Sequence, residues 1–174
     1  VWLGAKVSGQ TRVVAGEFNG EFAGGPWGSD SSDPRHKLYK VSKSDLADPL
    51  ASDDFQNWPT ALGAPLIDNN GNGTYEPLPS GPDMPDFIGD QVIWAVMNDG
   101  DPTTHSIFHS APMGLELQMT MFGFDRPDEF GDMLFIKELI INRGAETINE
   151  MIIGLWSDPD LGDAADDLVG CDTT

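Results

Sequence analysis

The chain has one cysteine, Cys171, among its 174 residues. A single cysteine cannot form a disulfide within the chain, so we expect a small buried side chain or a partner cysteine on a segment outside this sequence. A catalytic thiol is not expected, because no cationic neighbour stands close enough in the sequence to lower the pKa of Cys171.

Basic residues are scarce: 9 Lys and Arg stand against 29 Asp and Glu, and the formal net charge is -20. Nucleic acid and anionic membrane surfaces are therefore not expected partners, because both are bound by basic faces. So large an excess of one sign repels itself in the folded state. Divalent cations are the partners that would offset it.

The sequence also lacks a long apolar run. None approaches the roughly 20 residues that a membrane helix requires, and the longest, residues 151–156, has the length of a strand. The chain starts at Val1 rather than Met, on residues typical of a strand. We therefore expect a piece of a longer protein, for which the lack of a signal peptide carries no information.

Large apolar residues are nevertheless plentiful, with 5 Trp and 9 Phe, so we expect a packed core. Sustained helical periodicity is missing, whereas short alternating segments separated by Gly, Pro, Asn and Asp are frequent. The pattern predicts an all-β fold, an antiparallel β-sandwich with long acidic loops and at most short helices near Ser44 and over residues 52–58. The expected strands are residues 2–7 and 10–15, paired as a hairpin through Ser8-Gly9, and residues 91–97, 115–122, 134–142 and 150–156.

The expected organisation is one domain over residues 1–174. Residues 1–88 form a loop-rich half that carries the hairpin and a calcium-type loop, and residues 89–174 supply the main sandwich strands. In the strand over residues 115–122, Leu115 and every second residue after it share one face. Glu116, Gln118 and Thr120 fall on the other face, which we expect to meet solvent.

Residues 68–76 read Asp-Asn-Asn-Gly-Asn-Gly-Thr-Tyr-Glu. Oxygen-bearing side chains recur at alternate positions with a glycine at the sixth, as in the first half of an EF-hand calcium loop. Pro79 stands where that loop has its bidentate Glu, so we expect a distant carboxylate, Asp83, Asp86 or Asp90, to complete the site. An Asn-Gly turn pair is the alternative. The predicted calcium ligands are Asp68, Asn70, Asn72, Thr74 and Glu76.

Two further acidic segments follow. Residues 98–102 contain Asp99 and Asp101, and they are interpreted as an Asp-Gly turn or a cation site. Residues 158–172 carry six carboxylates and no base, a density that favours calcium over zinc or copper. A solvated acidic loop is the alternative there. The predicted ligands of this second calcium site are Asp158, Asp160, Asp163, Asp166 and Asp167.

No catalytic constellation emerges, so we do not expect an enzyme. His105 and His109 have the spacing of a zinc peptidase pair, but no Glu follows His105 and prolines bracket the segment. Glu116, Glu138 and Glu150 could supply a glycosidase pair, although strand-borne Glu on a solvent face is commoner. Three tryptophans could form a sugar-stacking platform; we expect core positions for Trp58 and Trp94 and leave Trp27 open.

The order of several short motifs resembles the N-terminal region of large secreted proteins of Bacteroidetes, Ignavibacteria and Calditrichota. These motifs are residues 2–9, 57–59, 68–77, 89–91, 98–101, 114–116, 154–163 and 170–172. Such proteins often end in a type IX secretion sorting domain. The resemblance implies export, an extracellular or cell-surface location in a bacterium, and a parent chain that continues past Thr174.

The leading hypothesis is a secreted or cell-surface, non-enzymatic domain that calcium stabilises and that has a structural, adhesive or assembly role. Its expected partners are calcium ions, further copies of itself or surface proteins, and glycans. The alternative is a carbohydrate-binding module or an accessory domain of a secreted hydrolase. A third hypothesis is a metal-dependent hydrolase that uses His105 and His109. A further hypothesis is strand addition at an exposed edge formed by the first strand, which would link copies head to tail.

Overall fold

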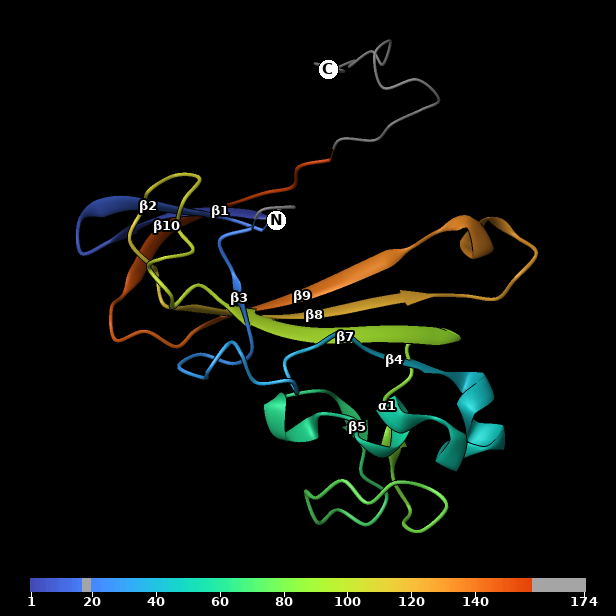
Figure 1. The fold of residues 1–174 in the computed structure, drawn as a ribbon. Helices are drawn as coiled ribbons and strands as arrows, with labels where there is room; N and C mark the ends of the chain where they lie inside the picture. Colours follow the sequence, from blue (N-terminus) through green and yellow to red (C-terminus); the bar gives the residue numbers. More distant parts are fainter. Residues whose placement is uncertain (17–19, 158–174) are drawn as a thin grey trace.

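The computed structural model describes residues 1–16 and 20–157 (Figure 1). The fold is all-β and antiparallel, with sheets of three, five and two strands and only short helical turns, as predicted. The strands are β1 (Trp2–Val7), β2 (Gln10–Ala15), β3 (Ala23–Gly24), β4 (Tyr39–Ser42), β5 (Leu66–Ile67), β6 (Met84–Pro85), β7 (Gln91–Asn98), β8 (Leu115–Gly123), β9 (Phe135–Asn142) and β10 (Ile148–Gly154). The helical turns are Lys43–Ala47, Pro49–Ala51, α1 (Asp53–Gln56), Thr60–Leu62 and Glu129–Asp132.

The three-stranded sheet has the order β10-β1-β2. Its hairpin is confirmed: Ser8 and Gly9 both have positive φ, 51° and 78°, the geometry of a tight turn that matches the twist of the two strands. The expectation of an exposed edge at the first strand is wrong. β1 lies between β2 and β10, so its backbone hydrogen bonds are used on both sides.

The five-stranded sheet has the order β3-β7-β8-β9, and β4 also pairs with β7, along the same edge as β3. The strands predicted over residues 91–97, 115–122 and 134–142 are confirmed as β7, β8 and β9. The smaller sheet lies over one end of the larger one, and the helical turns and β5 lie on the opposite side (Figure 1). Pairing of β1 with β10 and of β4 with β7 joins the two halves of the chain.

Each face of the larger sheet carries a core. One core contains Tyr39, Val41, Phe55, Trp58, Ala64, Val92, Trp94 and Val96. The other contains Leu3, Ala5, Val7, Val14, Met113 and Leu115. The predicted solvent face of β8 is therefore wrong for two residues: Glu116 is 3% and Thr120 is 6% exposed. The cause is that other segments of the chain cover this face of the sheet as well.

Within the described residues, no helix is both long and apolar enough to cross a membrane.

Candidate ion-binding loop

The loop over residues 68–76 joins β5 to β6 and folds on its own side chains. Gly71 and Gly73 have φ of 71° and 75°, and a Cβ at either position would meet no atom within 4 Å, so the glycines are needed for backbone conformation alone. The Asp68 carboxylate accepts hydrogen bonds from Gly71 N at 2.7 Å and Gly73 N at 2.8 Å. Asn72 N donates to Asn70 Oδ1 at 3.1 Å, and Thr74 N to Asn72 Oδ1 at 2.7 Å.

These turns bring the polar side chains of the loop together. The Nδ2 atoms of Asn70 and Asn72 lie 2.7 and 2.8 Å from the same oxygen, Glu76 Oε2. Asp68 holds the middle of the loop through the two glycine N–H groups. Three predicted ligands, Asn70, Asn72 and Glu76, thus belong to one group of hydrogen-bonded side chains, and a fourth, Asp68, binds the backbone of the same loop. The fifth, Thr74, contributes the backbone N–H that Asn72 binds.

The backbone hydrogen bonds of the loop favour the charged form of Asp68. The hydrogen bond from Gly73 N lowers the pKa of Asp68 below its usual value; burial opposes this effect, and the hydrogen bond from Gly71 N reinforces it. Asp68 is therefore a charged carboxylate at neutral pH. Each asparagine donates its amide N–H to Glu76 and accepts a backbone N–H through its amide oxygen, which fixes the orientation of both amide groups.

Asp83 closes the base of the loop. It is fully buried, and its carboxylate accepts hydrogen bonds from Asn69 N at 3.0 Å and Glu76 N at 2.9 Å, at the two ends of the loop. Of the three distant carboxylates that the sequence suggests, Asp83 is the one that touches the loop. Asp90 lies elsewhere, because it binds Lys43 and Asp125 N. Asp83 positions the loop through N–H groups.

The second predicted calcium site, Asp158, Asp160, Asp163, Asp166 and Asp167, lies outside the described residues. Across residues 1–16 and 20–157, no group of three or more His, Cys, Asp and Glu side chains could hold a metal ion. The loop over residues 68–76 is of another composition: two carboxamides converge on one carboxylate, Glu76, and a second carboxylate, Asp68, binds the loop backbone.

The acidic segment over residues 98–102 forms a turn whose carboxylates bind protein groups. Asp99 is fully buried and accepts hydrogen bonds from Met113 N, Gly114 N and Leu115 N at 2.6, 3.0 and 2.6 Å. Asp101 Oδ1 accepts from Thr103 N and Oγ1 at 2.8 and 2.6 Å. This arrangement favours the Asp-Gly turn over a cation site.

The candidate catalytic groups do not assemble. His105 and His109 lie in an irregular segment, and the buried ring of His105 binds the Asp99 carbonyl oxygen through Nε2 at 2.9 Å. Glu116 pairs in register with Ile141, and Glu138 with Met119, so the two carboxylates are on opposite faces of the sheet. Glu150 is on the other sheet and pairs with Lys6 at 2.6 Å.

Glu116 belongs to a buried polar cluster. It accepts hydrogen bonds from Trp27 N, Gln118 Nε2 and Arg143 Nη2, each at 3.0 Å. Burial acts to raise the pKa of Glu116, but the hydrogen bond from Arg143 and those from Trp27 N and Gln118 outweigh it and hold the pKa below its usual value. Glu116 therefore anchors the loop before β4 to β8.

A buried acid that sequence reasoning missed is Glu21. It is fully buried and accepts hydrogen bonds from Ala15 N at 2.9 Å and from Ile107 N and Phe108 N at 3.0 Å. It fastens the segment over residues 105–108 to the end of β2. An isolated acid between Gly20 and Phe22 gives no sequence signal for this role, because Ile107 and Phe108 are more than eighty positions away.

The tryptophans divide as expected. Trp58 and Trp94 are core residues, 3% and 1% exposed. Trp27 is 36% exposed and borders a cavity of about 280 Å³ that Ser29, Asn98 and Asp101 also line.

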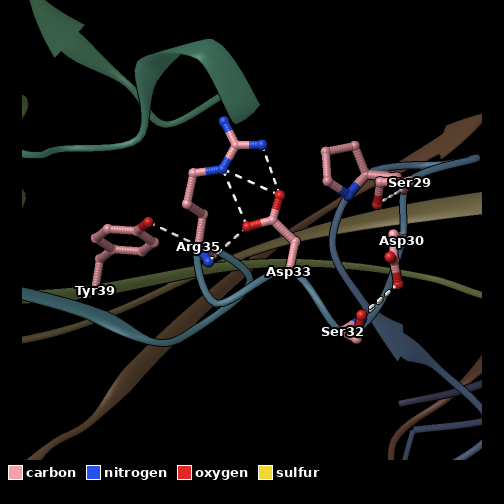
Figure 2. A network of polar contacts seen from close by, with 7 residues as sticks. Ser29, Asp30, Ser32, Asp33, Arg35 and Tyr39 are labelled. Atoms are coloured by element: carbon pink, nitrogen blue, oxygen red, sulfur yellow. Dashed lines mark hydrogen bonds and ion pairs between the residues drawn. The ribbon is translucent and has the colours of Figure 1, made fainter.

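The loop that carries Trp27 is stiffened by its own polar contacts (Figure 2). Asp33 binds Arg35 Nε at 3.0 Å and Nη2 at 2.6 Å, and Tyr39 Oη donates to Arg35 O at 2.8 Å. Ser32 Oγ donates to Asp30 at 2.7 Å, and Ser29 Oγ to the carbonyl oxygen of Pro26 at 2.7 Å. Hydrogen bonds from the Arg35 side chain and backbone hold the pKa of Asp33 well below its usual value.

Comparisons with protein-family models, with curated proteins and with solved structures found no match for this chain.

Proposed function

We propose that this protein is an exported, non-enzymatic β domain that calcium stabilises and that has a structural, adhesive or assembly role at a bacterial surface. One observation carries the proposal. The side chains of Asn70, Asn72 and Glu76 converge in a loop whose backbone binds Asp68 and whose two ends are held by the buried carboxylate of Asp83.

Calcium is the cation that suits this donor set. Carboxylate, carboxamide and backbone oxygens on a flexible loop are the ligands that calcium prefers, and thiolate and imidazole are not among the converging groups. With two carboxylates and two neutral amides, the loop has a low ligand charge. Low ligand charge gives weak calcium sites of roughly 10⁻⁴–10⁻³ M, as in extracellular modules, which supports export.

A thermal melt tests this proposal. At a hundredfold excess of calcium over Kd, binding adds about 2.7 kcal/mol to the free energy of unfolding. For a chain of this size, we expect the melting temperature to be roughly 5–10 °C higher in calcium than in EGTA. Asp68→Ala removes one carboxylate of the loop and should abolish most of this difference.

The matched control for that melt is Asp132→Ala, which removes an exposed aspartate far from the loop and should keep the full calcium response. Identical melts of the wild type in calcium and in EGTA would refute the proposal. A calcium response that survives Asp68→Ala would move the ion away from residues 68–76.

A second candidate function, sugar binding, is favoured by the position of Trp27. Its indole is 36% exposed beside a cavity of about 280 Å³ with hydroxyl, amide and carboxylate groups on the walls. An aromatic face beside polar groups suits the apolar and hydroxyl-bearing sides of a sugar ring. Glycan-array binding that Trp27→Ala abolishes and Trp156→Ala leaves intact would support this function. An array without hits would dismiss it.

A further inference from the structure

Two strands leave their outer edges without a partner within the described residues. β9 pairs only with β8, and β10 pairs only with β1. The two strands follow each other through the turn over residues 143–147, where the two sheets of the sandwich diverge (Figure 1). No strand of residues 1–16 and 20–157 therefore covers the side of the sandwich between β9 and β10.

A groove of about 650 Å³ lies at this side. Its floor is apolar: Leu115 and Ile140 come from the larger sheet, and Ile148, Met151 and Ile153 come from β10. Leu115 and Ile148 also belong to the core between the sheets, so the groove is the part of that core that reaches the surface.

The strands that border the groove expose large apolar side chains. Ile136 and Leu139 on β9 are 58% and 51% exposed, and Ile152 and Ile153 on β10 are 73% and 54% exposed. Natural edge strands are usually blunted by proline, charge or a covering segment, because an open edge invites pairing with another chain. β9 has eight residues, no proline and only two charges, Lys137 and Glu138.

The charges around the groove are acidic. Glu146 lines it, and Glu138 shares the sheet face of Ile140. The nearby basic side chains form ion pairs or lie on another face of the sheet. Arg143 forms an ion pair with Glu116, and Lys6 forms one with Glu150. Lys137 is on the opposite face of β9. A second copy of the chain would bring another -20 to this surface, so like-charge repulsion disfavours it as the occupant.

We propose that β9 and the groove beside it form a docking site for an extended segment of another protein, apolar at alternate positions and flanked by Lys or Arg. The segment adds as a strand along β9, with backbone hydrogen bonds to its free edge. Alternate side chains enter the groove against Ile140, Met151 and Ile153. Basic flanks meet Glu138 and Glu146.

A peptide-binding experiment tests this site. The probe is a synthetic peptide of alternating valine and threonine with a pair of lysines at each end, titrated into the full chain in calcium buffer. One control peptide has glutamates in place of the lysines, and another has N-methylated valines, which cannot donate backbone hydrogen bonds. We expect the lysine peptide to bind at least about tenfold more tightly than either control, a difference of about 1.4 kcal/mol.

Two variants localise the binding. Ile153→Asp places a charge in the groove and should weaken binding about tenfold or more. Leu50→Asp makes the same change at a residue that is 65% exposed, in the turn Pro49–Ala51 beside α1, and should bind as the wild type does. Amide shift mapping on the wild type should place the largest changes in β9 and β10, whatever the stability of the variants.

Any of five outcomes would overturn the proposal, the first four of which concern the peptide. These four are equal binding of lysine and glutamate peptides, no saturable binding below millimolar peptide, wild-type affinity in Ile153→Asp, and shifts outside β9 and β10. Dimerisation of the wild type without peptide that Ile153→Asp abolishes would make a second copy the occupant and would overturn it too. Calcium binding at residues 68–76 is measured without peptide, so failure at one site is distinguishable from failure at the other.

Discussion

Buried carboxylates hold the loops of this molecule in place through hydrogen bonds. Glu21, Asp83 and Asp99 are each fully buried, and each accepts hydrogen bonds from two or three backbone N–H groups. Several of these donors lie in irregular segments that have few strand partners. The buried acids therefore replace secondary structure as the fixed points of the loops.

The first residue-scale prediction concerns Asp83. Replacing it with alanine leaves Asn69 N and Glu76 N without their acceptor, so we expect a loss of about 1–3 kcal/mol in the free energy of unfolding. The ends of the loop should also separate, which weakens calcium binding. Denaturant unfolding and calcium titration measure the two effects. Asp132→Ala serves as the exposed control, and equal stability of the two variants would contradict the role assigned to Asp83.

The second residue-scale prediction concerns pH. The folded-state pKa of Glu116 is below its usual value of 4.5, so its contribution to stability is present above that pH and is lost as the pH falls through the folded-state pKa. Glu116→Gln cannot form the charged hydrogen bond with Arg143 and should cost about 2 kcal/mol at neutral pH.

The cost of Glu116→Gln should shrink as the pH falls below 4.5, because the wild type then loses the same charge. Chemical denaturation at a series of pH values measures the difference between the two proteins. A difference that stays constant down to the acid limit would show that the charge of Glu116 contributes nothing.

At the scale of elements, local signals were enough for the strands and for one turn. The hairpin follows from Ser8-Gly9, β8 from alternation, and β7 and β9 from short apolar runs, since each signal lies within a few residues. Strand order was not predictable in this way. That β1 lies in the middle of its sheet depends on β10, which is separated from it by most of the chain.

The same difference between local and distant contacts decides which parts of the candidate site could be predicted from the sequence. The spacing of Asn70, Asn72 and Glu76 is local, and their convergence could be predicted from the sequence. The partners of Glu21 and Asp99 could not, because they depend on how distant loops fold over the sheets. Glu116 was placed in solvent for a related reason: the sequence does not show that segments far from β8 cover its second face.

The hairpin turn provides an element-scale prediction. Gly9 has a φ of 78°, and a Cβ there would meet no atom within 4 Å, so Gly9→Ala carries only a backbone cost of about 1 kcal/mol. Gly4→Ala is the control, because its Cβ would have ordinary contacts at 4.0 Å inside β1 and should be neutral or slightly stabilising. Thermal melts that rank the two variants in the reverse order would exclude the turn geometry.

At the scale of the whole molecule, the net charge of -20 is the dominant electrostatic fact. Several ion pairs of the described residues are largely exposed, among them Lys6–Glu150 and Lys37–Asp53, so they offset little of this repulsion. Stability should therefore depend on ionic strength as well as on calcium.

We expect the melting temperature in EGTA to rise by a few degrees between about 0.02 and 0.5 M NaCl, because salt screens like charges. At equal ionic strength, CaCl2 should stabilise the protein more than MgCl2, since magnesium demands a stricter octahedral site. Asp68→Ala should reduce the advantage of calcium over magnesium. A melt that is insensitive to NaCl would mean that the charges are already too far apart to interact.

The central place of β1 also sets the order of events in folding. β1 ends at Val7, and its second partner, β10, begins at Ile148. The smaller sheet, and the core that it closes with Met113 and Leu115, cannot be completed until nearly all of the described chain has been synthesised. Contacts between such distant segments fold slowly. A nascent chain would therefore keep its first hairpin without the third strand of its sheet, with one edge of β1 unpaired, until β10 had been synthesised.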